Sequence, residues 1–235
     1  MRIDKLIANS TSWGRKEIKQ FIKKGLVLVN GKAVSDSGFH VDEENDIITL
    51  SGERIVYSRY TYLMLNKPSG YISATFDKHY PVVTDLVPAE FSHASLFPVG
   101  RLDIDTHGLL LLTNNGDLAH RLLSPKSHVP KTYFVRSLKP VKPSDIEVFK
   151  NGITLAPDFT TMSSVLCPSK DKPNESEVTI YEGKFHQVKR MFEAIDNEVV
   201  YLKRLSMGPL TLDASLPEGK CRPLTEDEID KLLNI

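Results

Sequence analysis

The sequence predicts a two-domain α+β protein, and three features of the chain lead to this prediction. Its length of 235 residues exceeds the ~150 residues of a typical domain. Its 40% hydrophobic, 26% charged and 8% aromatic residues are close to the average of globular proteins with a packed core. A helix and a hairpin pattern come first, and patterns of buried strands follow. This composition excludes collagen-like, coiled-coil and wholly disordered structures.

Residues 15–24 have the pattern of an amphipathic helix. Ile18, Phe21 and Ile22 follow the i, i+3, i+4 spacing of one buried stripe, and Gly25 supplies a stop. At about 100° per residue, the basic residues fall within one arc of roughly 100° away from that stripe. Such an arc suits a phosphate backbone, although a helix face that only contacts solvent has the same composition. The arc consists of Arg15, Lys16, Lys19 and Lys23.

A β-hairpin is predicted directly after this helix. The apolar run 26–29 and the run 32–34 flank Asn30-Gly31, a dipeptide that favours a tight two-residue turn. Residues 47–50 predict a further strand.

A second domain is predicted to begin after a short linker near residues 56–59. The segment 62–71 reads as a strand that runs into a turn at 68–70. The aliphatic run 109–112, bounded by glycine and asparagine, reads as a buried strand. Asp103 precedes this strand, where a carboxylate is held rigidly and has access to a cleft.

Charge is distributed unevenly along the chain. The 30 basic and 30 acidic residues cancel, yet residues 1–24 hold seven lysines and arginines against two acids. The stretch between Asp117 and Asp145 carries six basic residues and no acid, and we expect a second basic patch there. Acidic clusters at 42–46 and 225–230 provide the balance. The zero net charge is thus an average over opposed surfaces.

Several classes of site are not expected. Two cysteines are too few for a disulfide framework or a zinc motif, and the scattered histidines lack the spacing of a metal site. Loops for nucleotide phosphates and dinucleotides are missing from the sequence. We expect no metal and no cofactor. Signal-peptide and membrane-spanning patterns are also missing, so a cytoplasmic protein without a membrane partner is expected.

The first part of the chain resembles the S4 RNA-binding domain. The resemblance rests on the order helix, basic helix and G-x-V-x-V-N-G at residues 25–31, and it covers residues 1–57. One departure is Gly14, where serine is common as the helix cap. The resemblance implies RNA contacts by Arg2, Lys5, Arg15, Lys16 and Lys19.

The rest of the chain resembles the pseudouridine synthases that modify ribosomal RNA. Four blocks occur in the family's order: NKPSG (66–70), GRLDIDTHGLLLLTN (100–114), SPKSHVPKTY (124–133) and EGKFHQVKRMF (182–192). Within the family they look closest to the small-subunit enzymes. Departures are TNNG for the common TNDG and Lys189 where many members have arginine. The resemblance implies a catalytic domain at 60–235 with a mixed, mostly antiparallel sheet and flanking helices.

The resemblance also implies a reaction and the residues that perform it. Uridine becomes pseudouridine when the N1–C1′ bond breaks, the uracil rotates and C5 takes the place of N1. The family assigns the carboxylate of this reaction to Asp103 and its basic partner to Lys189, which would keep a buried carboxylate ionised. Tyr133 matches the tyrosine that stacks on the uracil, its simpler alternative being a core aromatic. Arg101 is the candidate for the side chain that fills the gap left by the flipped base, its alternative being a salt bridge or phosphate clamp.

The remaining site residue and the alternatives follow from the same blocks. Val188, Met191, Phe192 and Ile195 predict a helix with a core-facing stripe, which turns Arg190 outward to RNA or solvent. Asp105, taken as a loop residue, lies on the same side as Asp103 if the chain is extended, so a nucleoside hydrolase with paired carboxylates is a weaker alternative.

The expected partner is 16S ribosomal RNA or a partly assembled small subunit, bound by a monomer. A large-subunit (23S) synthase and a non-enzymatic RNA-binding or ribosome-assembly protein are the alternatives within this resemblance.

Overall fold

The computed structural model describes residues 1–11, 13–55, 57–155 and 159–235. The chain forms two compact units, residues 1–61 with 87–96, and residues 62–86 with 97–235. The predicted linker at 56–59 begins at Val56, which lies outside the described residues. We keep 1–57 and 60–235 as the proposed domain boundaries.

The first unit packs two helices and a short helical segment around a small sheet. Helices α1 (Ile3–Ser10) and α2 (Arg15–Lys23) precede the strands, and the 3-10 segment η2 (Ala89–Ala94) contacts α1. The strand order is β2-β1-β3-β4, with all pairs antiparallel. The strands are β1 (Val27–Val29), β2 (Lys32–Ala33), β3 (Ile48–Leu50) and β4 (Glu53–Ile55).

The predicted amphipathic helix and hairpin of this unit are present. Ile18 and Ile22 of α2 join the buried core, and Gly25 ends the helix region with a φ of 72°. Asn30 and Gly31 connect β1 to β2 with φ values of 50° and 80°, the two positive φ angles that a type I′ turn requires.

The second unit is built on one long, mostly antiparallel sheet. Among its described residues the strand order is β11-β12-β8-β13-β7-β5-β15, with β14 beside β13 and β6 beside β7. Only the β13–β7 pair in this part of the structure is parallel. The expected α+β sheet is therefore confirmed. The strands are β5 (Tyr62–Lys67), β6 (Phe97–Pro98), β7 (His107–Thr113), β8 (Lys131–Ser137), β11 (Val165–Pro168), β12 (Glu175–Ile180), β13 (Val199–Met207), β14 (Leu210–Thr211) and β15 (Cys221–Pro223).

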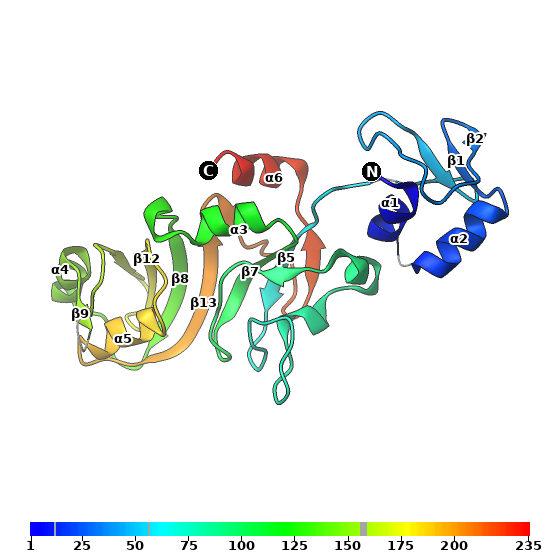
Figure 1. The fold of residues 1–235 in the computed structure, drawn as a ribbon. Helices are drawn as coiled ribbons and strands as arrows, with labels where there is room; N and C mark the ends of the chain where they lie inside the picture. Colours follow the sequence, from blue (N-terminus) through cyan, green and yellow to red (C-terminus); the bar gives the residue numbers. More distant parts are fainter. Residues whose placement is uncertain (12, 56, 156–158) are drawn as a thin grey trace. The chain divides into compact units, whose positions relative to one another are not determined.

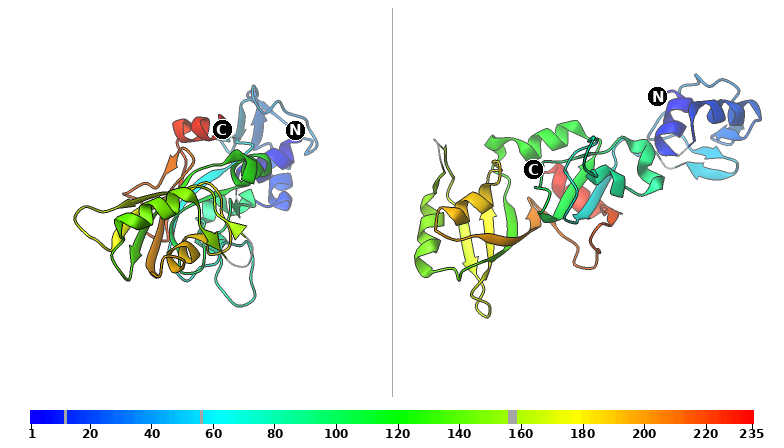
Figure 2. Two further views of the ribbon diagram at one scale, coloured as in Figure 1. Left: turned by 90° about the vertical axis from the view of Figure 1, so that its left-hand side faces the viewer. Right: turned by 90° about the horizontal axis from the view of Figure 1, so that it is seen from below.

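Helices gather at both ends of this sheet (Figures 1 and 2). Helices α4 (Pro143–Asn151) and α5 (Gln187–Glu193) lie in the half that holds β8, β11 and β12. Helices α3 (Gly116–Leu123) and α6 (Glu226–Leu233) lie in the half that holds β5 and β7. The shorter elements are η1 (Val83–Leu86), η3 (Pro125–Ser127), β9 (Thr154–Leu155) and β10 (Phe159–Thr160).

The two strands predicted from apolar runs are paired with each other and buried in the second unit. Strand β7 contains the run 109–112, and all six residues of β5 are buried. Helix α5 buries Val188, Met191 and Phe192 as predicted, but it ends at Glu193, so Ile195 lies beyond it. Asn115 caps α3 by accepting the N–H of Leu118 at 3.1 Å, so asparagine at this TNNG position retains the capping oxygen.

Gly108 allows the parallel strands β7 and β13 to approach closely. It pairs with Arg204 and has a φ of 99°. A Cβ atom at this position would lie 2.3 Å from the carbonyl oxygen of Arg204, so any side chain would push the strands apart.

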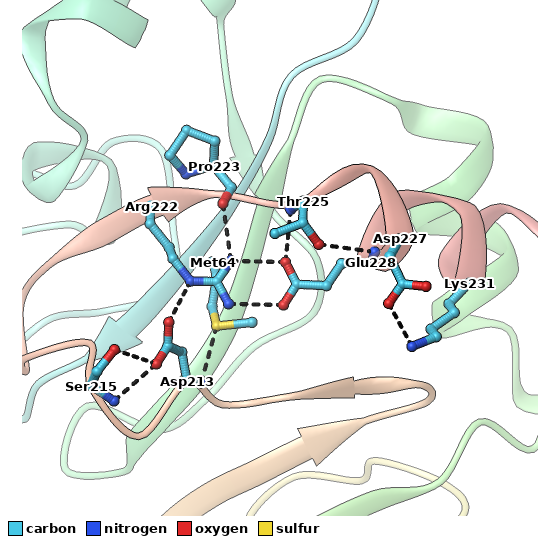
Figure 3. A network of polar contacts seen from close by, with 9 residues as sticks. All are labelled: Met64, Asp213, Ser215, Arg222, Pro223, Thr225, Asp227, Glu228 and Lys231. Atoms are coloured by element: carbon cyan, nitrogen blue, oxygen red, sulfur yellow. Dashed lines mark hydrogen bonds and ion pairs between the residues drawn. The ribbon is translucent and has the colours of Figure 1, made fainter.

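The C-terminal strand and helix are held by one arginine (Figure 3). The Arg222 guanidinium donates to Asp213 Oδ2 at 2.7 Å and to both carboxylate oxygens of Glu228 at 2.8 Å. Thr225 begins α6, and its backbone N–H donates to Glu228 Oε2 at 2.8 Å. Strand β15, the loop before it and α6 are thus tied together. The described residues contain no helix with the length and apolarity needed to cross a bilayer.

Candidate active site

The loop between β6 and β7 carries Asp103 and is held in place by hydrogen bonds. The backbone of Leu102 both donates to and accepts from Ser73 Oγ, at 2.9 and 3.0 Å. Within the loop, the N–H of Thr106 donates to the carbonyl of Asp103 at 3.1 Å, which closes a turn. Asp103 therefore stands on a fixed backbone immediately before a buried strand.

The buried side chain of Lys67, at the end of β5, also holds this loop in place. Its side chain is 0% exposed, and Nζ lies within hydrogen-bond distance of four carbonyl oxygens: Pro68 at 3.0 Å, Asp103 at 3.1 Å, Ile104 at 3.2 Å and Thr106 at 2.8 Å. Burial lowers the pKa of Lys67 to about 8, against the opposing effect of the Asp105 and Asp103 charges. No role was predicted for Lys67, although it stands in the NKPSG block; a lysine at the end of an otherwise uncharged strand is the signal that points to it.

The carboxylate of Asp103 faces two side chains from the start of α5. Lys189 Nζ lies 3.3 Å from Oδ2, and His186 Nε2 lies 3.6 Å from Oδ1. His186 has a φ of 50° directly before the helix, which turns its ring toward the loop. The predicted pairing of Asp103 with Lys189 is present. His186 is not among the predicted site residues, although it stands in the same HQVKRM block as Lys189.

Asp105 is a loop residue as predicted, but it is also the nearer partner of Lys189. Lys189 Nζ donates to Asp105 Oδ1 at 2.6 Å and to Oδ2 at 2.8 Å. Burial raises the pKa of Asp105, but the hydrogen bond and charge of Lys189 outweigh it and leave that pKa lowered. Burial likewise acts to lower the pKa of Lys189, and the two aspartates outweigh it and raise that pKa. Lys189 therefore stays charged at neutral pH.

Tyr133 lies on β8 and completes the wall opposite the loop. Its side chain is buried, and it lines a narrow cavity of about 60 Å³ together with Arg101, Asp103 and Lys189. Arg101 is exposed at this cavity. Four predicted residues from three separate segments thus meet in one place. A carboxylate fixed between a cation and an imidazole, beside an aromatic ring, can act as a nucleophile or accept a proton.

The predicted RNA-binding residues of the first unit differ in their surroundings. Lys5, Arg15, Lys16 and Lys19 are exposed. Arg2 is exposed too, but its guanidinium is paired with Asp4 at 2.9 Å. In the second unit, Arg190 lies on α5 and is half-buried. Contact of any of these side chains with RNA stays a prediction.

The second predicted basic patch, between Asp117 and Asp145, is reduced because three of its six basic residues are buried or paired with acids. Lys131 is buried, Arg136 pairs with Glu175 at 3.0 Å, and Lys139 pairs with Asp196 at 3.1 Å. Strand β8 alternates its side chains between two faces, so charges that are neighbours in sequence separate in space. Arg121, Lys126 and Lys142 are exposed, and a basic patch formed by them stays a prediction.

Comparisons with known proteins give a consistent result for both units. The model of a family described as RNA pseudouridylate synthase matches residues 61–194, and that of the S4 domain matches residues 1–48. The chain is 47% identical to an uncharacterized RNA pseudouridine synthase, YtzG, of Bacillus subtilis, over 99% of this chain and 98% of the relative. It is 39% identical to ribosomal small subunit pseudouridine synthase A of Escherichia coli K12, over 97% and 98%. A crystal structure titled as a pseudouridylate synthase matches with a TM-score of 0.69 at 37% identity, over 99% of both chains.

Proposed function

Because the chain belongs to the RNA pseudouridylate synthase family and carries an S4 domain at its N-terminus, we propose that it converts uridine 516 of 16S ribosomal RNA to pseudouridine. The protein is an RNA pseudouridine synthase, an isomerase. The reaction exchanges the N1–C1′ bond of uridine for a C5–C1′ bond and, in net terms, moves one proton from C5 to N1. It therefore needs an anionic group near the ribose, a proton acceptor and walls that retain the detached uracil.

The choice of RNA rests on the relatives that carry a substrate in their names. The relatives of Escherichia coli and Haemophilus influenzae, 39% and 37% identical, are both named ribosomal small subunit pseudouridine synthase A. Their alignment includes the S4 domain, since it covers at least 97% of this chain. We propose the 16S RNA, free or in a partly assembled small subunit, as the partner of a monomeric cytoplasmic enzyme.

The meeting of Asp103, Tyr133 and Lys189 at one narrow cavity is the observation that supports the proposed catalytic roles. Asp103 is the anionic group. Attack on C1′, attack on the base and assistance of elimination are three routes compatible with its position. Lys189 keeps the carboxylate charged and oriented by Coulomb attraction at 3.3 Å.

Tyr133 and Arg101 act on the base and on the space that it leaves. The buried ring of Tyr133 offers a face on which the uracil stacks, and its hydroxyl is a candidate acceptor for the C5 proton. Arg101, exposed at the same cavity, is suited to fill the stack from which the target base has been flipped.

The experiment is a map of new pseudouridines after incubation of the purified protein with unmodified 16S and 23S transcripts. Carbodiimide labelling followed by primer extension locates each modified base. The expected result is one new stop at the position of uridine 516 with wild-type protein and none with Asp103→Asn. A parallel reaction with partly assembled small subunits compares the two forms of the substrate.

Two outcomes would contradict the proposal. Modification confined to 23S RNA would assign the protein to the large subunit. Absence of any new pseudouridine on every substrate, with RNA binding intact, would leave a non-enzymatic binding or assembly role.

A further inference from the structure

A second, larger cavity of about 850 Å³ adjoins the narrow one in the second unit. Its wall includes the loop residues 73–76, the segment 123–125 at the end of α3, and Phe159 and Met162. The two cavities share part of their lining, so a ligand can extend from one into the other. The shared residues include Arg101, Tyr133, Gly183 and Lys184.

Two buried cations, Lys131 and Arg204, line this larger cavity. Their exposed fractions are 8% and 2%. Arg204 on β13 is the register partner of Tyr133 on β8, and Lys131 lies two residues before Tyr133 on the same strand. Directly opposed residues and residues two apart share one face of a sheet, so both cations lie on the face that presents Tyr133.

Neither cation is neutralised by its own hydrogen bonds. Arg204 Nε donates to the carbonyl of Leu109 at 2.7 Å, and no acceptor among the described residues lies within reach of the buried Nη2. Lys131 Nζ donates to the carbonyl of Val129, at 2.7 Å. Burial, and then the charge of Arg204, lower the pKa of Lys131 to about 8. Two like charges are thus placed close together out of water, an arrangement that is costly without an anion.

The acid in the lining of this cavity, Glu182, already accepts two hydrogen bonds. Glu182 lines the same cavity and acts to raise the pKa of Lys131, less strongly than Arg204 lowers it. Its Oε1 accepts from the N–H of Met162 at 2.8 Å and from Gln187 Nε2 at 2.9 Å. One carboxylate that is already hydrogen-bonded therefore offsets the charge of the two cations only in part.

We propose that Lys131 and Arg204 form the binding site for a backbone phosphate of the nucleotide whose base stacks on Tyr133. This inference rests on the proposed function, since it takes an RNA strand as the occupant. A phosphodiester fits the site because it supplies one negative charge and oxygen acceptors, and because the shared lining connects the site to the cavity of Asp103. Anchoring the phosphate holds the flipped nucleotide in place while its base is detached, so the site contributes positioning.

The test compares uridine with its phosphates as ligands of the full-length protein. Isothermal titration calorimetry at constant ionic strength measures the Kd of uridine, uridine 5′-monophosphate, uridine 3′-monophosphate and inorganic phosphate. At least one monophosphate is expected to bind about tenfold or more tightly than uridine, the size typical of hydrogen bonds to charged groups. Inorganic phosphate is expected to bind more weakly than that monophosphate.

Matched variants assign the preference to the two cations. Lys131→Met removes a buried charge at similar volume, so folding is expected to persist and the phosphate preference to fall below about threefold. Lys126→Met removes one exposed charge from the neighbouring segment and is expected to leave the preference unchanged. Arg204→Lys keeps the positive charge but loses the planar fork of donors, so the preference is expected to lie between those of wild-type protein and Lys131→Met.

Three results would overturn the proposal: no phosphate preference in wild-type protein, an equal loss in Lys126→Met, or inorganic phosphate that binds as tightly as the preferred monophosphate. Failure of the site and failure of the proposed function are separable. A protein that modifies 16S RNA but shows no phosphate preference refutes only the site. A protein with the preference that modifies no ribosomal RNA refutes only the function.

Discussion

Lys189 Nζ lies 2.6 Å and 2.8 Å from the two carboxylate oxygens of Asp105. The contact that it makes with Asp103 is longer, at 3.3 Å. One ammonium therefore serves two carboxylates that are separated by a single residue. Asp105 is the more exposed of the two acids, so it holds Lys189 from the solvent side. The other oxygen of Asp103 faces His186.

Substitution of each aspartate by asparagine should separate their roles. Asp103→Asn is expected to abolish pseudouridine formation, because the amide is neither a nucleophile nor an anion. Asp105→Asn is expected to lower kcat by about tenfold at most, since it loosens Lys189 without removing the reactive carboxylate. Single-turnover rates on a 16S fragment measure both, and filter binding checks that RNA affinity is nearly unchanged in Asp103→Asn.

Full activity of a purified Asp103→Asn variant would refute the assignment of Asp103. Equal loss of activity in both variants, with intact folding, would show that the reaction requires both carboxylates. Paired carboxylates are what the nucleoside hydrolase alternative requires.

The pKa of Lys67 predicts an alkaline limit to catalysis. As pH rises through about 8, the ammonium of Lys67 becomes an amine with one donor fewer for its four carbonyl acceptors. The loop that carries Asp103 should loosen, and kcat should fall with a midpoint near pH 8. Initial rates at saturating RNA between pH 6.5 and 9.5 measure this limb.

Two controls identify Lys67 as the cause. Folding lowers the pKa of Lys67 from 10.5, so between about pH 8 and 10.5 this group binds more protons in the unfolded chain than in the folded one. Its contribution to the free energy of unfolding therefore rises over that range. The activity must therefore fall without a fall in Tm. Lys131 also has a pKa of about 8, so the limb in kcat should persist in Lys131→Met. A limb that vanished in that variant would refute the role of Lys67.

The basic arc on α2 predicts a salt-dependent contribution to RNA binding. Arg15→Ala combined with Lys19→Ala should weaken binding and reduce the slope of log K against log salt by about 1.5, close to the release of one counterion per lost contact. Titrations at several salt concentrations measure the slope. Lys150→Ala with Lys170→Ala removes two exposed charges from the second unit and is the matched control. Unchanged affinity and slope in the α2 variant would leave the arc as a solvated helix face.

The Arg222 network predicts a loss of stability in acid (Figure 3). Hydrogen bonds from the Ser215 side chain and backbone, and then from Arg222, lower the pKa of Asp213 from 3.8 to about 2. A carboxyl group with a lowered pKa stabilises the fold at pH values above the pKa that it has in the unfolded chain. That contribution is lost as pH falls from about 4 to 2.

Asp213→Asn should therefore lower Tm by a few degrees at pH 7 and by progressively less as pH approaches 2. Scanning calorimetry across this range measures the difference. Asp227→Asn is the control, because Asp227 is 74% exposed and pairs only with Lys231 in Figure 3. A pH-independent effect of Asp213→Asn would show that its charge is not responsible.

Local patterns were sufficient to predict much of the fold. The helix at α2, the Asn30-Gly31 turn and the buried strand β7 each depend on residues within a few positions of one another. Charge along the chain was less informative for the second basic patch, because Lys131 is buried on β8 and Arg136 pairs with Glu175 on β12. The end of α5 before Ile195 was missed for a related reason, since helix ends depend on the following turn.

The sequence by itself determined the family, the S4 and synthase units, and the candidates Asp103, Tyr133 and Lys189. Motifs that occur in a fixed order can be recognised without any knowledge of distances. Only the tertiary structure determined which of these residues are in contact. Lys189 and Asp105 are 84 residues apart in the chain, and the lysine at the end of β5 reaches carbonyls more than 30 residues away. Contacts of that range come from strand pairing and burial, which bring buried cations beside a carboxylate or a cavity, and no local pattern encodes them.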